Sequence, residues 1–240
     1  MRIVIVGSSL VYNNPSRNDS YQTVYGFILK EYLKSKGNHD IFIFGRAKNH
    51  TRMQRRRDRL FYDLEQFEPD IVIIHLGVVD CAPRLFLEHE QIFLQSLPKF
   101  LRLKLIKFLS NHRDYFTRKF KKEYVSINDF EHYFQKILDE IRQIHAIPII
   151  INISKPNQYL INRSYLFLEN VIAYNKILLK LARKNHCNII DVYSLIESQP
   201  SYQLADGIHL SKSGNKKLAN LLITEINSLA RINIKLKLIN

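Results

Sequence analysis

The sequence is poor in cysteine, glycine, proline and tryptophan. Its 240 residues include 2 cysteines, 7 glycines, 7 prolines and no tryptophan. Two cysteines, Cys81 and Cys187, cannot form a disulfide framework or a four-thiolate zinc site, and they suit a reducing compartment. So few glycines and prolines argue against a fibrous protein or a low-complexity chain.

Long apolar stretches and ligand-binding motifs are also absent. No apolar run reaches the roughly 18 residues that a membrane-spanning helix needs. The first apolar run covers only residues 3–6, which is too short for the core of a secretory signal, so we expect a cytoplasmic protein. The histidines show no metal-ligand spacing, and no glycine-rich nucleotide-binding loop occurs. We therefore expect neither a metal nor a cofactor.

The overall composition is that of a folded protein. Hydrophobic residues make up 46% and charged residues 24%, close to the globular average. No repeat, linker or low-complexity stretch divides the chain, which predicts one domain over residues 1–240.

Five short apolar runs predict buried β-strands. They cover residues 3–6, 41–44, 71–76, 147–153 and 188–192. The runs are apolar nearly throughout rather than alternating, which is typical of parallel strands covered on both faces. Helical patterns separate them, so the sequence predicts a flavodoxin-like α/β fold, a three-layer doubly wound parallel sheet with strand order 2-1-3-4-5. His75, near the end of the third strand, is predicted to be a core histidine.

Helical patterns fill most of the remaining chain. Helices are predicted over residues 19–36, 52–67, 128–145, 163–185 and 212–231. A basic helical insert occupies about 85–125, after the third strand, as a core element, a lid or an interfacial anchor. Asp19 or Ser20 is expected to cap the first helix, and Ser126 or Asn128 the one over 128–145. The tail 232–239 alternates in polarity, which fits an edge strand, an ordered flap or a frayed end.

The net charge of +14 comes from two segments. Residues 46–59 contain 7 basic side chains and residues 99–122 contain 9, each with one acid, and the rest of the chain is neutral. Such segments are either a solvated face or the contact for something anionic, such as a phospholipid headgroup layer, an acidic glycan or a nucleotide-linked donor. No nucleic-acid partner is expected, because the basic residues are not interleaved with exposed aromatics in any known motif.

Polar residues of catalytic type lie in the loops expected at one edge of the sheet, where parallel strands end and ligands bind. Ser9 follows the first strand in a glycine turn, and Asp206 and His209 lie three residues apart before the last helix. A histidine held in one tautomer by a carboxylate can take a serine proton and return it to a leaving group. Backbone N–H groups in the serine turn can bind an oxyanion.

These features together resemble the SGNH hydrolases of the GDSL esterase/lipase superfamily. The similar blocks are 3–10, Gly45, 70–80, 173–191 and 206–214, and the Asp-x-x-His block followed by Ser-x-x-Gly-Asn is the most specific. The resemblance implies the fold predicted above and a nucleophile at Ser9, with His209 as base and Asp206 orienting it. It also implies oxyanion donors from the N–H groups of Ser9 and Gly45.

Two positions depart from the family pattern. Ser8 stands where the family has an aspartate, and Val79 stands where it has the asparagine of the oxyanion hole. A valine side chain cannot donate a hydrogen bond. Either turnover is slow, or a donor such as Asn49, Asn13 or Arg84 replaces the asparagine, or the reaction differs.

The run 78–84 bears on the substrate. It resembles runs in GDSL-like proteins linked to bacterial surface-polysaccharide genes, and Asp80, Pro83 and Arg84 are placed to form an ordered polar turn beside the substrate. We predict a serine ester hydrolase acting on O-acyl groups of a carbohydrate or a lipid-linked glycan. The alternatives are an O-acyltransferase with the same site and a non-catalytic binder of an acidic glycan or membrane surface. Contact with the inner membrane surface would make the protein peripheral there.

Overall fold

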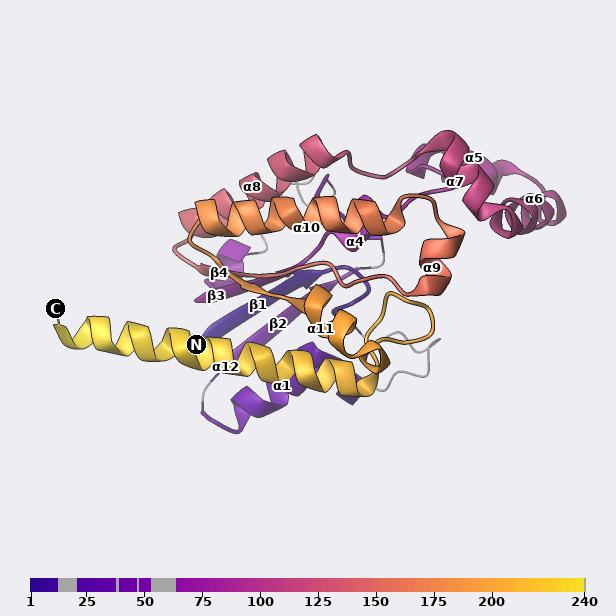
Figure 1. Ribbon diagram of the computed structural model, residues 1–240. Helices are drawn as coiled ribbons and strands as arrows, with labels where there is room; N and C mark the ends of the chain where they lie inside the picture. Colours follow the sequence, from indigo (N-terminus) through magenta and orange to yellow (C-terminus); the bar gives the residue numbers. More distant parts are fainter. Residues whose placement is uncertain (13–20, 38, 47, 53–63, 240) are drawn as a thin grey trace.

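One parallel sheet forms the centre of the protein, whose computed structural model describes residues 1–12, 21–37, 39–46, 48–52 and 64–239 (Figure 1). Five strands run in the order β2-β1-β3-β4-β5. They are β1 (Arg2–Gly7), β2 (Asp40–Gly45), β3 (Ile71–His75), β4 (Ile147–Ile151) and β5 (Asn188–Ile190). The predicted fold and strand order are confirmed, and every predicted strand boundary lies within two residues of the observed one.

Helices cover both faces of the sheet (Figure 1). On one face lie α8 (Ile127–Gln143) and α10 (Phe167–Lys184), and on the other lie α1 (Tyr25–Lys34) and α12 (Lys212–Ile239). Alternate residues of each central strand serve the two cores, so that Val4 packs toward α8 and α10 while Ile5 packs toward α1 and α12. Because both faces are buried, the strands need apolar residues at every position.

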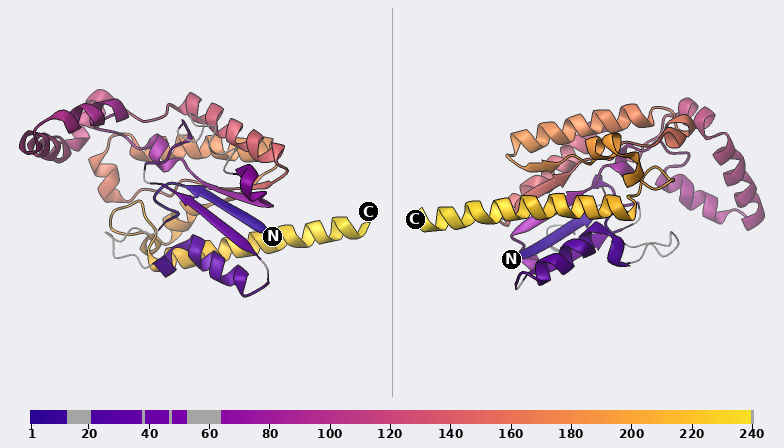
Figure 2. Two further views of the ribbon diagram at one scale, coloured as in Figure 1. Left: turned by 180° about the vertical axis from the view of Figure 1, so that it is seen from behind. Right: turned by 60° about the horizontal axis from the view of Figure 1, so that its bottom comes forward.

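The insert after β3 consists of three helices that project from the body (Figure 2). They are α5 (Glu88–Ser96), α6 (Lys99–Asn111) and α7 (Arg113–Phe120). The helix α6 buries none of its residues. The alternative of a core element is therefore wrong for α6, while a lid and an interfacial anchor remain.

Shorter elements connect the larger ones and had no clear sequence signal. They are η2 (Tyr21–Thr23), α4 (Val78–Cys81), α9 (Gln158–Arg163), α11 (Val192–Ser198) and η3 (Pro200–Tyr202). The single helix predicted over 163–185 begins instead at Phe167 and follows α9, because Leu166 adopts a left-handed backbone with φ of 61°. Such a conformation interrupts a right-handed helix.

The expected helix ends have different outcomes. The Ser126 side chain accepts a hydrogen bond from the N–H of Asp129, so Ser126 rather than Asn128 caps α8. The caps Asp19 and Ser20 lie outside the described residues, as do residues 53–63 of the predicted basic helix. Of the alternatives for the tail, an edge strand is wrong: α12 continues to Ile239, because nothing after Gly214 breaks the helix. No described helix is long and apolar enough to cross a membrane.

Candidate active site

Ser9 lies in the turn that follows β1. A side chain at Gly7 would place its Cβ 2.4 Å from Val11 and 2.9 Å from the carbonyl oxygen of His75, so the close turn requires glycine. The two serines that follow differ in environment. Ser8 is fully buried, and its hydroxyl has no hydrogen-bond partner among the described residues. The hydroxyl of Ser9 lies 2.8 Å from Nε2 of His209.

A tight loop positions His209 and Asp206. One carboxylate oxygen of Asp206 accepts the N–H groups of Ile208 and His209, each at 3.0 Å, and the other lies 2.6 Å from Nδ1 of His209. Gly207 allows the bend with a positive φ of 72°. Burial acts to raise the pKa of Asp206, but the His209 ring and the two N–H donors outweigh it and hold the pKa at about 2. Asp206 is therefore ionised at neutral pH.

The three side chains form a continuous chain of contacts. A carboxylate on Nδ1 places the imidazole proton there and leaves the lone pair of Nε2 facing the Ser9 hydroxyl. That arrangement can withdraw the serine proton as the oxygen attacks a carbonyl carbon. The structure thus brings the predicted residues Ser9, His209 and Asp206 together, although Ser9 and His209 are 200 residues apart in the sequence.

Two residues that sequence reasoning missed brace this loop. The amide of Asn157 donates to the carbonyl of Ala205, and its side chain packs against Gly207. The amide of Gln203 donates to the carbonyls of Lys155 and Gly207, both at 2.9 Å. Asn157 also caps α9 through the N–H of Leu160, and that helix start is the one local signal that marks the position.

Gly45 and Asn49 lie beside the serine turn. Gly45 pairs with Gly7 in the register of β1 and β2, and a Cβ at Gly45 would come within 2.6 Å of Val11. Asn49 is buried, and its side-chain amide donates to the carbonyl of Gly7 at 2.9 Å. Asn49 therefore ties the segment after β2 to the turn that carries Ser9. Asn13 lies outside the described residues.

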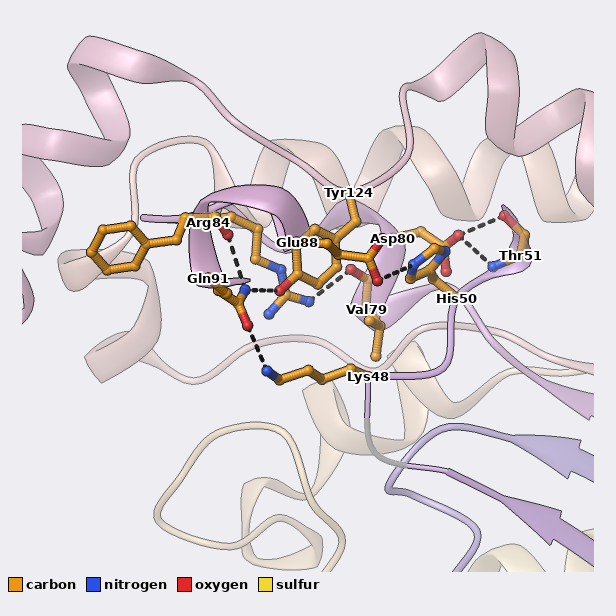
Figure 3. A network of polar contacts seen from close by, with 10 residues as sticks. Lys48, His50, Thr51, Val79, Asp80, Arg84, Glu88, Gln91 and Tyr124 are labelled. Atoms are coloured by element: carbon orange, nitrogen blue, oxygen red, sulfur yellow. Dashed lines mark hydrogen bonds and ion pairs between the residues drawn. The ribbon is translucent and has the colours of Figure 1, made fainter. Parts of the chain in front are cut away.

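Val79, Asp80 and Arg84 form a second polar group after β3 (Figure 3). Val79 is buried in α4, and its carbonyl accepts a hydrogen bond from Arg84 at 2.7 Å. One oxygen of Asp80 accepts the N–H and the hydroxyl of Thr51, while the other has no partner among the described residues. Burial raises the pKa of Asp80 against these two hydrogen bonds. Asp80 holds the segment after β2 in place through Thr51, and Arg84 closes the expected polar turn by bonding to the carbonyl of Val79.

The buried histidine and cysteine near this edge are core residues. The ring of His75 meets the hydroxyl of Tyr25 at 3.1 Å, and burial lowers the pKa of His75 to about 3. Burial raises the pKa of the fully buried Cys81 thiol. The described residues contain no group of three or more side chains able to hold a metal ion.

Comparison with known proteins connects this geometry to a family. The model of a family described as the GDSL-like lipase/acylhydrolase family matches residues 5–217. No curated protein is significantly similar in sequence.

Several solved structures share the fold. A lipase/acylhydrolase from Enterococcus faecalis is 16% identical, with 95% of each chain covered and a TM-score of 0.66. An acetylxylan esterase from Geobacillus stearothermophilus is 15% identical, with 94% of this chain and 93% of that chain covered and a TM-score of 0.63. A psychrotrophic esterase from Pseudoalteromonas sp. is 14% identical, with 96% and 98% covered and a TM-score of 0.59. At these identities the likeness concerns the fold alone.

Proposed function

We propose that this chain, which belongs to the GDSL-like lipase/acylhydrolase family and is an ester-hydrolysing enzyme, acts through Ser9 as its nucleophile. His209 is the general base and then the general acid, and Asp206 orients it. The observation that carries the proposal is the unbroken path from the Ser9 hydroxyl to Nε2 of His209 at 2.8 Å and from Nδ1 to Asp206 at 2.6 Å.

The reaction proceeds in two halves. In the first, the Ser9 oxygen attacks the ester carbonyl carbon while Nε2 of His209 takes the hydroxyl proton. The tetrahedral intermediate expels the alcohol, which receives that proton from His209, and an acyl group stays on Ser9. In the second half, His209 takes a proton from water, the resulting hydroxide attacks the acyl carbonyl, and the proton returns to Ser9 as the carboxylic acid leaves.

The oxyanion hole of this proposal consists of the N–H groups of Ser9 and Gly45. Val79 supplies no side-chain donor, and losing one such donor typically costs about 10²–10³ in turnover. Of the described side chains that could replace it, Asn49 donates to the carbonyl of Gly7 and Arg84 to that of Val79. We therefore expect slow turnover on simple esters.

The substrate we propose is an O-acyl group on a carbohydrate or a lipid-linked glycan. The fold-level likeness to an acetylxylan esterase is in keeping with a carbohydrate ester. An O-acyltransferase would use the same acyl-enzyme, with a sugar hydroxyl in place of water. Consumption of an acyl donor only when a glycan acceptor is present would favour the transferase.

We propose further that the insert contacts an anionic membrane surface, the cytoplasmic face of the inner membrane being the one expected. Six apolar side chains of α6 are more than a third exposed: Phe100, Leu101, Leu103, Leu105, Ile106 and Phe108. The helix also carries four basic residues and no acid. Apolar and basic residues exposed together are typical of helices that lie in the headgroup region of anionic bilayers. An acidic glycan would need the cations but would leave the apolar side chains in water.

A serine-directed fluorophosphonate probe tests the nucleophile. Wild type and Ser8→Ala should be labelled, and Ser9→Ala should not. Ser8→Ala is the matched control, because Ser8 is adjacent, fully buried and unpartnered among the described residues. Labelling that persists in Ser9→Ala would assign the nucleophile to another residue. No labelling of wild type would favour the non-catalytic binder.

A further inference from the structure

A cavity of about 760 Å³ lies between the projecting helices α5 and α6 and the segment after β3. Four of the side chains that line it are cations, namely Lys48, Arg84, Arg102 and Arg113. None of the described residues that line it is acidic. Phe86, Leu94 and Ile106 supply apolar wall, so the cavity combines a positive lining with hydrophobic surface.

Two of these arginines are partly buried, and among the described residues they bond only to neutral acceptors. Arg84 donates to the Val79 carbonyl and stacks on the ring of Tyr124 at 4.2 Å, while its Nε is buried without a partner among the described residues. Arg113 donates to the Ser164 hydroxyl at 2.7 Å and to the Pro83 carbonyl at 2.6 Å. Neither forms an ion pair with a carboxylate of the described chain.

The electrostatic consequence is an excess of positive charge in the cavity. Burial lowers the pKa of both arginines. The charge of Asp80 acts against this for Arg84, whereas for Arg113 the charges of Arg84 and Arg163 add to the effect. An arginine nonetheless keeps its proton in a protein. A partly buried cation to which no carboxylate is bonded is unfavourable, and an anion in the cavity would relieve both the desolvation and the mutual repulsion.

The wall around the cations is held in place by hydrogen bonds (Figure 3). Lys48 donates to Gln91 at 2.6 Å, and the amide of Gln91 bonds to Tyr124, on whose ring Arg84 stacks. The planar guanidinium group matches the paired oxygens of a carboxylate or phosphate. Fixed donors of this kind select an anion without first having to be ordered.

Two residues that line the cavity, Lys48 and Arg84, belong to the edge of the sheet that carries Ser9. Lys48 follows β2, Arg84 follows β3, and Ser9 follows β1 between them. In a parallel sheet all three segments leave from the same edge. Lys48 also precedes Asn49, whose amide bonds to Gly7, two residues before Ser9.

We propose that this cavity binds an anionic group, a carboxylate or a phosphate, carried by the ester substrate. The proposal rests on the proposed function, because it assigns the charge to the molecule whose acyl group reaches Ser9. It narrows the substrate class to esters of acidic sugars or of sugar phosphates. In this arrangement the anionic group lies in the cavity, and the acyl group that reaches Ser9 carries no charge.

Ligand binding tests the cavity independently of turnover. The protein is Ser9→Ala, and the probes are inorganic phosphate, glucuronate and neutral glucose at equal ionic strength. Phosphate or glucuronate should raise the midpoint of thermal unfolding, glucose should not, and whichever anion acts more strongly identifies the group. Adding Arg113→Gln or Arg102→Gln should remove the rise; Arg102 makes one contact of 3.5 Å, so its loss should not impair folding. Arg183→Gln, an exposed arginine on α10, should keep the rise.

Kinetics then separates this proposal from the proposed function. An acetylated glucuronate and an acetylated sugar phosphate should each exceed the matched neutral acetylated sugar about tenfold or more in kcat/KM, as expected for charge-assisted hydrogen bonds. Arg113→Gln should reduce that ratio through KM. Equal hydrolysis of all three, or no anion-dependent thermal shift, overturns the anion site and leaves the esterase intact. An anion-dependent shift without Ser9 labelling or hydrolysis overturns the esterase and leaves the anion site.

Discussion

Replacing Asp206 by asparagine should change the tautomer of His209 while leaving the loop folded. The amide oxygen of asparagine can still accept the N–H groups of Ile208 and His209, which now bond to one carboxylate oxygen. The amide nitrogen cannot accept the proton of Nδ1, which lies 2.6 Å from the other oxygen. The ring then carries its proton on Nε2, facing the Ser9 hydroxyl, and cannot act as a base.

The size of the loss follows from the exposure of the carboxylate. A fully buried triad aspartate replaced by asparagine costs about 10⁴ in kcat. The Asp206 side chain is 41% exposed, so water can accept from Nδ1 part of the time. We therefore expect kcat to fall by about 10²–10³, less than the roughly 10⁴ of a fully buried aspartate. KM should change little, since Asp206 acts through His209 rather than on the substrate.

The assay is the pH dependence of hydrolysis of a neutral activated ester. Because the pKa of Asp206 is about 2, this carboxylate stays ionised throughout the working range. The wild-type rate should rise once with pH, as expected for a reaction that needs one general base. Asp139→Asn is the control, because Asp139 is an exposed carboxylate whose described contact is one hydrogen bond from Gln135. A kcat of Asp206→Asn within a factor of two of wild type would refute the role of Asp206 in orienting His209.

The same substitution has a consequence for stability. The folded-state pKa of about 2 lies below the roughly 3.9 of an unfolded aspartate, so ionised Asp206 stabilises the fold above pH 3.9. That contribution is lost as the pH falls through 2. The free energy of unfolding, measured in urea, should therefore be higher for wild type than for Asp206→Asn at pH 6, and this gap should narrow below pH 4. A gap that is constant from pH 6 to pH 3 would contradict the lowered pKa.

The features that could be predicted from the sequence are those with a local signal. Apolar runs bounded by turns identify β1 and β3, because a doubly covered strand must be apolar on both faces. The positions of Ser9, Asp206 and His209 follow from motif resemblance, and parallel topology explains why a serine after the first strand meets a loop near the chain end.

The features that could not be predicted depend on contacts distant in sequence. Arg113 bonds to Ser164, 51 residues away, and such a partner has no local trace. The break before α10 uses Leu166 at a positive φ, where a glycine would have been the recognisable signal. Asp80 looks like a substrate ligand by its place in a family block, yet its carboxylate is bonded to Thr51.

Two further predictions concern the oxyanion hole and the projecting helices. Val79→Asn restores the missing donor and should raise kcat on a neutral activated ester at least tenfold, toward the roughly 10²–10³ of one oxyanion contact, while the neighbouring Val78→Asn should not. An unchanged rate would mean that backbone N–H groups already suffice. The protein should sediment with anionic vesicles but not with neutral ones. The exposed apolar residues of α6 enter the headgroup layer only where that layer attracts the basic residues of the helix. Phe100→Ser with Phe108→Ser should weaken this binding at constant charge. High salt should weaken it too, because it shortens the screening length from about 8 Å at physiological ionic strength to about 3 Å at 1 M. Sedimentation unaffected by both changes, or binding to an acidic glycan alone, would contradict the membrane contact.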